Sequence, residues 1–235
     1  MKRVLLSWSS GKDSAWMLHV LRQQPDIEVR GLLTTCNETV RRVAMHGVRE
    51  ELLDLQAQAA GLSLWKVPLP WPCSNEQYEA IMRECCRRAL ADGVEAIAFG
   101  DLFLADVRQY REKQLQGSGL APLFPLWGSG TAALAREMIA GGLRAIATCV
   151  DTAQIPASFA GREFDVRFLE ELPAAADPCG EKGEFHSFVY AGPMFDGELR
   201  VSRGEVVTRE QFVFADLTAE GISGKSGSAA ATGLR

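Results

Sequence analysis

The stretch "VLLSWSSGKDSAW", residues 4–16, interrupts an apolar run with six small or charged residues. Residues 4–6 are too apolar and too few for a surface element, and they predict a short buried strand. From Ala15 the apolar residues return at helical spacing, which predicts a helix that ends near Pro25. The polar residues between them lie in a strand-to-helix turn. Backbone N–H groups and the helix dipole at such a turn favour a bound anion, and phosphate is the usual one.

The composition is ordinary for a globular protein with a substantial core, since 47% of the 235 residues are apolar and 23% are charged. No apolar run approaches the ~18 residues of a membrane span, and the early first strand leaves no room for a signal peptide, so we expect a cytoplasmic protein. The net charge of −5 argues against nucleic acid as a partner. No two of the six cysteines have the spacing of zinc, cluster or redox motifs.

Strand-like and helix-like segments alternate through the first hundred residues. A capping box, Ser74 with Gln77, opens one of the predicted helices. The other segments of this part cover residues 28–36 (strand), 48–61 (helix), 62–67 (strand) and 94–101 (strand). This rhythm predicts an α/β fold, a parallel sheet flanked by helices, with ligands at the carboxyl ends of the strands. Later segments are less regular and predict a helix at 131–140 and strands at 143–151, 183–192 and 205–217.

The opening turn differs from two common phosphate loops. A Walker loop needs a Gly-Lys-Ser/Thr ending four residues after its first glycine, but Lys12 is followed by Asp13. A Rossmann fingerprint needs three spaced glycines, and only Gly11 is present. Residues 9–14, Ser-Ser-Gly-Lys-Asp-Ser, resemble the pyrophosphate loop of the ATP-pyrophosphatase family, Ser-Gly-Gly-Lys-Asp-Ser, with Ser10 in place of a glycine. A polar turn with a helix cap and no ligand is the alternative.

Each residue type in this loop suits ATP phosphates. Gly11 allows close approach of the backbone, and Lys12 offsets the negative charge. Asp13 is expected to bind Mg²⁺ or to cap the helix rather than to contact phosphate. The hydroxyl donors are Ser9, Ser10 and Ser14. The resemblance implies that ATP is split to AMP and pyrophosphate, with the AMP transferred to a substrate oxygen.

Three further stretches narrow the resemblance. "AFGDLFLADVRQYRE", "PLFPLW" and "DPCGEKGEFHSFVYAGP" are similar to the diphthine–ammonia ligase group of that family, and the likeness runs from about Lys2 to Leu217. That group usually carries a Glu-Thr pair after the Glu-Phe of residues 184–185. His186 and Ser187 stand here instead, a pattern typical of bacterial relatives. Bacteria lack diphthamide, so the chemistry carries over better than the substrate.

The resemblance implies an adenine nucleotide alpha-hydrolase-like, Rossmann-like domain in residues 1–105 and a smaller α+β substrate-binding region in residues 106–217. Residues 218–235 are rich in Gly, Ser and Ala and predict a disordered tail. The implied reaction uses ATP and Mg²⁺ to adenylate a carboxylate, small or protein-borne, which ammonia then attacks to give an amide. No glutaminase-like segment is visible, so free ammonia or a separate protein supplies the nitrogen. Whether the protein forms a homo-oligomer is left open.

Further candidates for the site lie outside the loop. Gly100 and Asp101 end a predicted strand, which places them beside the nucleotide. Thr34 and Thr35 are placed near the adenine or ribose by the resemblance alone. The candidates for substrate contact or catalysis are Glu181, Glu184, His186, Arg108 and Arg111.

Each of these substrate candidates has a plainer alternative. Glu184 and His186 would share one face of a strand and act as a pair, whereas a solvated glutamate and a core histidine are the other interpretation. Arg108 and Arg111 lie one helical turn apart and are candidates to share a phosphate, or else to face solvent. Glu181 contacts substrate or metal, or lies in a solvated loop.

Two other functions remain open at this stage. One is a ligase of the same type acting on a different carboxylate, in cobalamin-related metabolism for example. The other is a non-catalytic module that binds ATP or AMP and signals through a partner. A tRNA-thiolating relative is disfavoured because paired cysteines and a basic face are missing.

Overall fold

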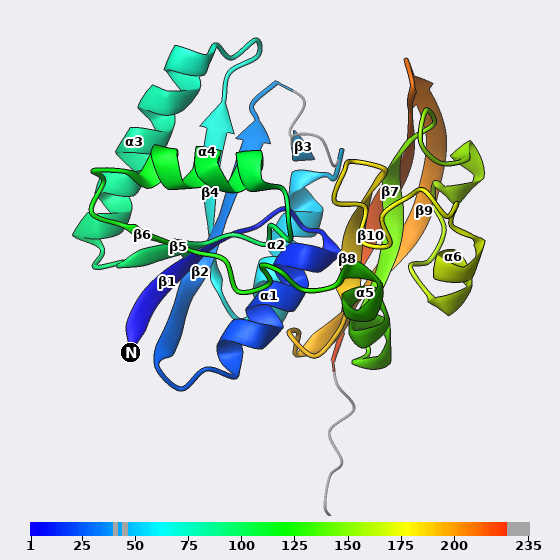
Figure 1. The fold of residues 1–235 in the computed structure, drawn as a ribbon, viewed down its shortest axis with the longest axis horizontal. Coiled ribbons are helices and arrows are strands. Elements are labelled where there is room, and N and C mark those ends of the chain that lie inside the picture. The colour runs from blue at the N-terminus through cyan, green and yellow to red at the C-terminus, as the bar shows by residue number, and fades with distance from the viewer. Residues whose placement is uncertain (40–41, 44–46, 225–235) are drawn as a thin grey trace, which may run out of the picture.

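We describe the protein from a computed structural model, in which residues 1–39, 42–43 and 47–224 are described. Two β-sheets lie side by side (Figure 1). The first sheet contains five parallel strands in the order β4-β2-β1-β5-β6. These strands are β1 (Lys2–Ser7), β2 (Ile27–Asn37), β4 (Ser63–Leu69), β5 (Ala96–Ala98) and β6 (Ala121–Leu123). The short β3 (Arg42–Val43) pairs antiparallel with the end of β2.

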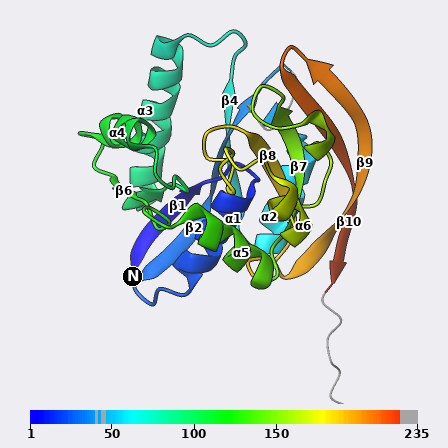
Figure 2. The same cartoon turned by 45° about the vertical axis from the view of Figure 1, so that its right-hand side comes forward.

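The helices cover both faces of this sheet. Apolar residues of α1 (Lys12–Arg22) and α2 (Glu50–Ala60) join the core shared with the second sheet. Apolar residues of α3 (Asn75–Ala91) and of the end of α4 (Ala105–Leu115) join a separate core on the opposite face. Figure 2 shows α3 and α4 on the side away from the second sheet. The expected parallel sheet flanked by helices is confirmed.

Local sequence signals explain where these helices begin and end. The expected capping box is present, since the Ser74 hydroxyl accepts from Gln77 N and the Gln77 side chain accepts from Ser74 N. Helix α2 ends at Gly61, whose φ of 63° is the left-handed conformation that favours glycine. Successive side chains of β1 point to opposite faces of the sheet, so Val4 and Leu6 join one core and Leu5 joins the other. The chain after β1 therefore emerges between two packed layers.

The second sheet is antiparallel, in the order β8-β7-β10-β9. Its strands are β7 (Arg144–Asp151), β8 (Phe185–Ala191), β9 (Gly197–Arg209) and β10 (Phe212–Gly224). The remaining helices are α5 (Thr131–Ala140), the 3₁₀ turn η1 (Ala157–Phe159) and α6 (Val166–Glu171). Antiparallel strands were expected in this part of the chain. A cluster of edge-to-face phenylalanines, with Phe168 4.9 Å from Phe159 and 5.0 Å from Phe185 between ring centroids, fills the space beside β8.

Two expected boundaries differ from the structure. The first sheet extends past residue 105, because β6 pairs with β5 in parallel and α4 precedes it. The expected disorder from Thr218 is wrong for residues 218–224, which form the second half of β10 and pair with β9. Ala219 and Ile222 pack against the large core, and the hairpin supplies the backbone hydrogen bonds that composition does not reveal. Residues 225–235 of the expected tail lie outside the described residues.

Candidate active site

The loop between β1 and α1 has the form of an anion-binding turn. Gly11 is the N-cap of α1, with extended backbone, and no described side chain caps the helix there. Asp13 therefore does not act as the helix cap. Ser14 instead stabilises the turn from within, since its hydroxyl donates to Gly11 O at 2.9 Å and lies 3.2 Å from the Ser9 hydroxyl. The start of the helix lines a polar cavity.

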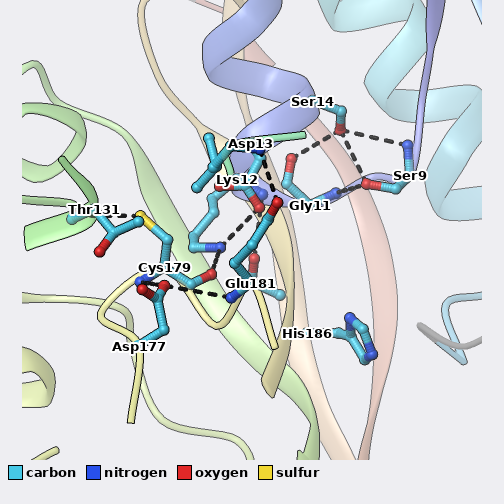
Figure 3. Close-up of polar contacts among 12 residues, drawn as sticks. Ser9, Gly11, Lys12, Asp13, Ser14, Thr131, Asp177, Cys179, Glu181 and His186 are labelled. Carbon is cyan, nitrogen blue, oxygen red and sulfur yellow. Dashed lines mark hydrogen bonds and ion pairs between the residues drawn. The ribbon is translucent and has the colours of Figure 1, made fainter. Parts of the chain in front are cut away.

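A polar cavity of about 250 Å³ lies over this turn. Figure 3 shows three of the side chains that line it, Lys12, Asp13 and Glu181. Four segments far apart in the sequence line it: the β1–α1 loop, the residues that follow β5 (Gly100 and Asp101), Arg111 of α4, and the segment from Gly180 to Ser187. Gly100 lets the chain after β5 pass close to the start of α1. A Cβ at this position would lie 3.2 Å from the carbonyl carbon of Asp13 and 3.3 Å from Ser14 N.

Lys12 is the buried cation of the cavity. Its Nζ donates to Asp13 Oδ2 at 2.8 Å and to the carbonyl oxygen of Cys179. Nζ also lies 5.2 Å from the ring centroid of Phe185. Burial works against the charged form, but Asp13, Cys179 and Glu181 together outweigh this effect and raise the pKa of Lys12. The ammonium therefore stays charged inside the polar cavity.

Three carboxylates face the same cavity. Glu181 Oε1 accepts from Leu102 N at 2.7 Å, and burial, with Asp13 and Asp101 adding to it, raises the pKa of Glu181 to about 7. Burial also raises the pKa of Asp101, against the opposing effect of Arg111, whose Nε lies 3.9 Å from Asp101 Oδ2. Burial raises the pKa of Asp13, which Lys12 opposes. The cavity thus gathers three carboxyl groups with raised pKa values, and Lys12 and Arg111 are the positively charged side chains among its described lining residues.

A second, more apolar cavity of about 310 Å³ adjoins the first. Thr34 and Thr35 at the end of β2 line it, and so do side chains of α3 and α4. The two cavities share five lining residues: Ser7, Ser9, Phe99, Arg111 and His186. Burial, with Lys12 nearby, lowers the pKa of His186 to about 4, so its imidazole is neutral at physiological pH. Arg111 and His186 therefore lie where the two cavities meet.

The structure brings most of the candidates together. The following line the polar cavity: Ser9, Gly11, Lys12, Asp13, Ser14, Gly100, Asp101, Arg111, Glu181 and His186. Thr34 and Thr35 line the second cavity, and the Thr34 hydroxyl donates to Trp8 O at 2.8 Å. The described lining residues of both cavities do not include Ser10, Glu184 or Arg108.

Glu184 does not face a substrate in this structure. It is 1% exposed, and its two carboxylate oxygens accept from Asp177 N at 2.7 Å and Lys182 N at 3.0 Å. Glu184 lies one residue before β8 and is not among the described lining residues of the cavity that His186 lines, so the two side chains face different surroundings. Glu184 instead closes the loop of residues 177–183, whose Cys179 carbonyl accepts from Lys12.

Arg108 points away from the site that Arg111 lines. Its guanidinium lies 4.8 Å from the ring centroid of Phe124 and 4.7 Å from that of Trp127, and it pairs with Glu112 at 2.8 Å. The expected sharing of one phosphate between the two arginines is therefore not found. Helical spacing alone does not predict which of the two arginines lines the cavity.

Sequence reasoning missed two residues that hold the loop. The Ser187 hydroxyl accepts from Lys12 N at 3.2 Å. Ser187 directly follows His186, the residue that was singled out as a candidate. Gln56 on α2 is completely buried and contacts the loop through its amide. A polar residue within an otherwise apolar helix face is the signal that could have identified Gln56.

We predict that Glu184→Gln lowers the free energy of unfolding by about 1–3 kcal/mol, because one amide N–H would then face a backbone donor inside the loop. In a chain of this size the melting temperature should fall by about 2–4 °C for each kcal/mol. Thermal unfolding measures the effect, with Glu170→Gln on exposed Glu170 as the matched control. An unchanged melting temperature together with lost turnover would restore Glu184 as a substrate contact.

Two family models cover almost the whole described chain. The model described as diphthamide synthase N-terminal domain matches residues 1–122, and that described as diphthamide synthase C-terminal domain matches residues 130–219. The chain belongs to the diphthamide synthase family. The resemblance drawn from the sequence is therefore confirmed, and the family's two domains correspond to the two sheets.

Curated relatives agree with the family. The diphthine–ammonia ligase of Bos taurus is 28% identical over 184 residues, which cover 72% of this chain and 68% of the relative. That of Rattus norvegicus is 25% identical over 244 residues, covering 94% and 91%. The expectation of an enzyme of the ATP-pyrophosphatase ligase type is confirmed by these relatives together with the family.

Two solved structures are similar to part of the chain, at lower sequence identity than the curated relatives. A predicted subunit of tRNA methyltransferase from Methanocaldococcus jannaschii matches with a TM-score of 0.40 and 16% identity over 60% of this chain and 75% of that one. The U34-tRNA thiolase NcsA from Methanococcus maripaludis matches with a TM-score of 0.36 and 18% identity over 57% and 55%. Within the described ranges, no helix has both the length and the apolarity to cross a bilayer.

Proposed function

We propose that this member of the diphthamide synthase family adenylates a carboxylate with ATP and transfers the acyl group to ammonia. The observation that carries the proposal is the pair of adjoining cavities that meet at Arg111 and His186. Phosphates suit the polar cavity over the start of α1, and an adenosine suits the more apolar cavity at the ends of β1 and β2. The α-phosphate of such a nucleotide lies at the junction.

The residues of the polar cavity have distinct roles in this proposal. Lys12 and the backbone N–H groups at the start of α1 bind the β- and γ-phosphates, which leave together as pyrophosphate. Arg111 neutralises charge on the α-phosphate, where its guanidinium is half-buried and only loosely paired with Asp101. The neutral His186 lines the same junction without adding positive charge.

The donor set fits a magnesium ion. Asp13 Oδ1 and Asp101 Oδ2 are buried beside the cavity and have no hydrogen-bond partner among the described residues. In the described part of the chain, no group of three or more His, Cys, Asp or Glu side chains is placed to hold a metal. Mg²⁺ is usually held by one or two carboxylates together with phosphate oxygens and water. Asp13 and Asp101 could supply the carboxylates. Bound there, the ion would neutralise phosphate charge.

The proposed reaction has two steps. A carboxylate oxygen of the acceptor attacks the α-phosphorus, the bond to the bridging oxygen breaks, and pyrophosphate leaves. Ammonia then attacks the acyl carbon, and AMP leaves with the electron pair of the carbon–oxygen bond. Glu181 accepts the proton that the nitrogen loses, since its carboxylate faces the cavity and its raised pKa suits a base near neutral pH. Positioning and charge neutralisation supply the rest of the catalysis.

The relatives' name suggests diphthine as the acceptor, and the residue at position 186 suggests a different carboxylate. The nitrogen comes from free ammonia or from a separate protein in this proposal. All six cysteines are free thiols, which suits the reducing cytoplasm where we place the protein. A cobalamin-related carboxylate and a non-catalytic nucleotide-binding role stay as competing assignments.

Product analysis tests the proposal. Purified protein is incubated with ATP, Mg²⁺, ammonium and a panel of carboxylates, and the nucleotides and phosphates are separated. We expect AMP and pyrophosphate in equal amounts, and only with an accepted carboxylate. Formation of ADP and orthophosphate would place the protein in another phosphoryl-transfer class. Saturable ATP binding without turnover for any acceptor would favour the nucleotide-binding module.

A further inference from the structure

The turn of the phosphate loop passes through a strained residue. Ser10 has a φ of 70°, in the left-handed region that only glycine adopts without cost. It stands where the family's loop usually has glycine, and it is completely buried. Its hydroxyl oxygen has no hydrogen-bond partner within the described residues. The side chain therefore does not stabilise the conformation, and contacts to its backbone must do so.

The contacts to Ser10 converge on its carbonyl oxygen. Gln56 Nε2 donates to Ser10 O at 3.0 Å, and Val189 N donates to the same oxygen at 3.0 Å. Nε2 also donates to Val189 O at 2.7 Å, and Gln56 Oε1 accepts from Trp8 Nε1 at 2.8 Å. One completely buried amide thus joins the residue after β1, the strained turn and β8.

These contacts fix the loop in position as well as in conformation. Helix α2 carries Gln56 and belongs to the first domain, whereas Val189 belongs to β8 of the second sheet. Lys12 N donates to Ser187, two residues away on the same strand. The loop is therefore held between α2 and β8 at the point where the N–H groups of α1 face the polar cavity.

We propose that Gln56 is a positioning residue for ATP: its amide keeps Ser10 in the left-handed turn that directs residues 11–14 into the polar cavity. The inference rests on the proposed function only in assigning that cavity to phosphates. Gln56 is absent from the described lining of either cavity, so it acts through the loop. An apolar residue of similar size at this position would fill the space, but it would leave Trp8 Nε1 and Val189 O without their buried partner.

Calorimetry with a non-hydrolysable ATP analogue tests the inference. We expect Gln56→Leu to bind the analogue about tenfold more weakly than the unsubstituted chain, which is the usual effect of leaving buried polar groups unpaired. Gln58→Leu, on the exposed face of the same helix, is the control and should bind normally. Gln56→Met is a second variant, since its flexible side chain suits an irregular space.

Ser10→Gly separates positioning from general stability. Glycine adopts the left-handed turn without strain, so the loop no longer depends on Gln56. In the double variant Ser10→Gly/Gln56→Leu we expect at least about threefold recovery of analogue affinity, a coupling that neighbouring residues in one network show. If Gln56→Leu does not fold alone, Ser10→Gly should restore both folding and binding.

Several outcomes would overturn the inference. Normal analogue binding by folded Gln56→Leu and Gln56→Met would contradict it. Strictly additive losses in the double variant, or no rescue of a misfolded single variant, would reduce Gln56 to a core residue. Failure of the unsubstituted chain to bind the analogue is a different result, because it would refute the proposed function itself.

Discussion

Replacing Lys12 with methionine is expected to lower the rate of AMP formation about a thousandfold, the upper range for losing one preorganised charged contact to a reacting group. Methionine keeps the length of the side chain among the aromatic rings and removes only the ammonium. Lys12 is only 2% exposed, and its ammonium donates to Asp13 and to the Cys179 carbonyl. Solvent therefore screens the attraction between this ammonium and a bound anion only weakly.

The matched control is Lys182→Met. Lys182 lies in the neighbouring loop with an exposed side chain, and its contacts come from the backbone: its N–H donates to Glu184 and its carbonyl oxygen accepts from Gln154 Nε2. This variant should keep turnover within about twofold, as exposed substitutions usually have little effect. Turnover of Lys12→Met comparable to that of the control would show that the loop does not bind the phosphates of ATP.

The second large effect is expected for Glu181→Gln, with about a hundredfold loss of amide formation, within the range for removing a general base. Glutamine keeps an oxygen for Leu102 N but cannot accept a proton. Since the pKa of Glu181 is about 7, the unsubstituted enzyme should lose activity as the pH falls through 7, and the variant should lack this limb. Methoxyamine, a much weaker base that stays uncharged across this pH range, should replace ammonia as the nucleophile so that its own protonation does not set the profile.

The raised pKa of Glu181 should also make the stability of the fold depend on pH. The pKa of Glu181 is raised by folding, so its ionisation favours the unfolded chain as the pH rises from about 4.5 to about 7. Glu181→Gln removes this contribution. Its melting temperature relative to the unsubstituted chain should therefore rise across that window. A constant difference between pH 4 and pH 8 would mean that Glu181 is not desolvated as the structure places it.

The strand–loop–helix unit could be predicted from residues 4–16 because all of its signals are local. The buried strand, the glycine-containing turn and the helical spacing lie within thirteen residues of each other. The capping box at Ser74 was predictable for the same reason. Residues 218–224 were not, because a strand with few apolar residues is stabilised by its pairing with β9, which composition does not encode.

The site was predicted in outline but not in its division of roles. Glu184 and Arg108 have the residue types of ligand contacts, yet Glu184 accepts from backbone N–H groups of its own loop and Arg108 packs against Phe124 and Trp127. Gln56 stands out in the sequence only as a polar residue on an otherwise apolar helix face, and its role depends on α2 and β8 meeting at the loop. Side chains that act through tertiary contacts are the ones that one sequence leaves unidentified.

The most direct measurement of the central claim follows a heavy oxygen isotope from the acceptor. Once product analysis has identified an accepted carboxylate, both of its oxygens are labelled and the nucleotide product is examined by mass spectrometry. Attack of the carboxylate on the α-phosphorus predicts one labelled oxygen in each AMP and one left in the amide. Unlabelled AMP, with the label retained in the acceptor or in orthophosphate, would contradict adenylation of the carboxylate at this site.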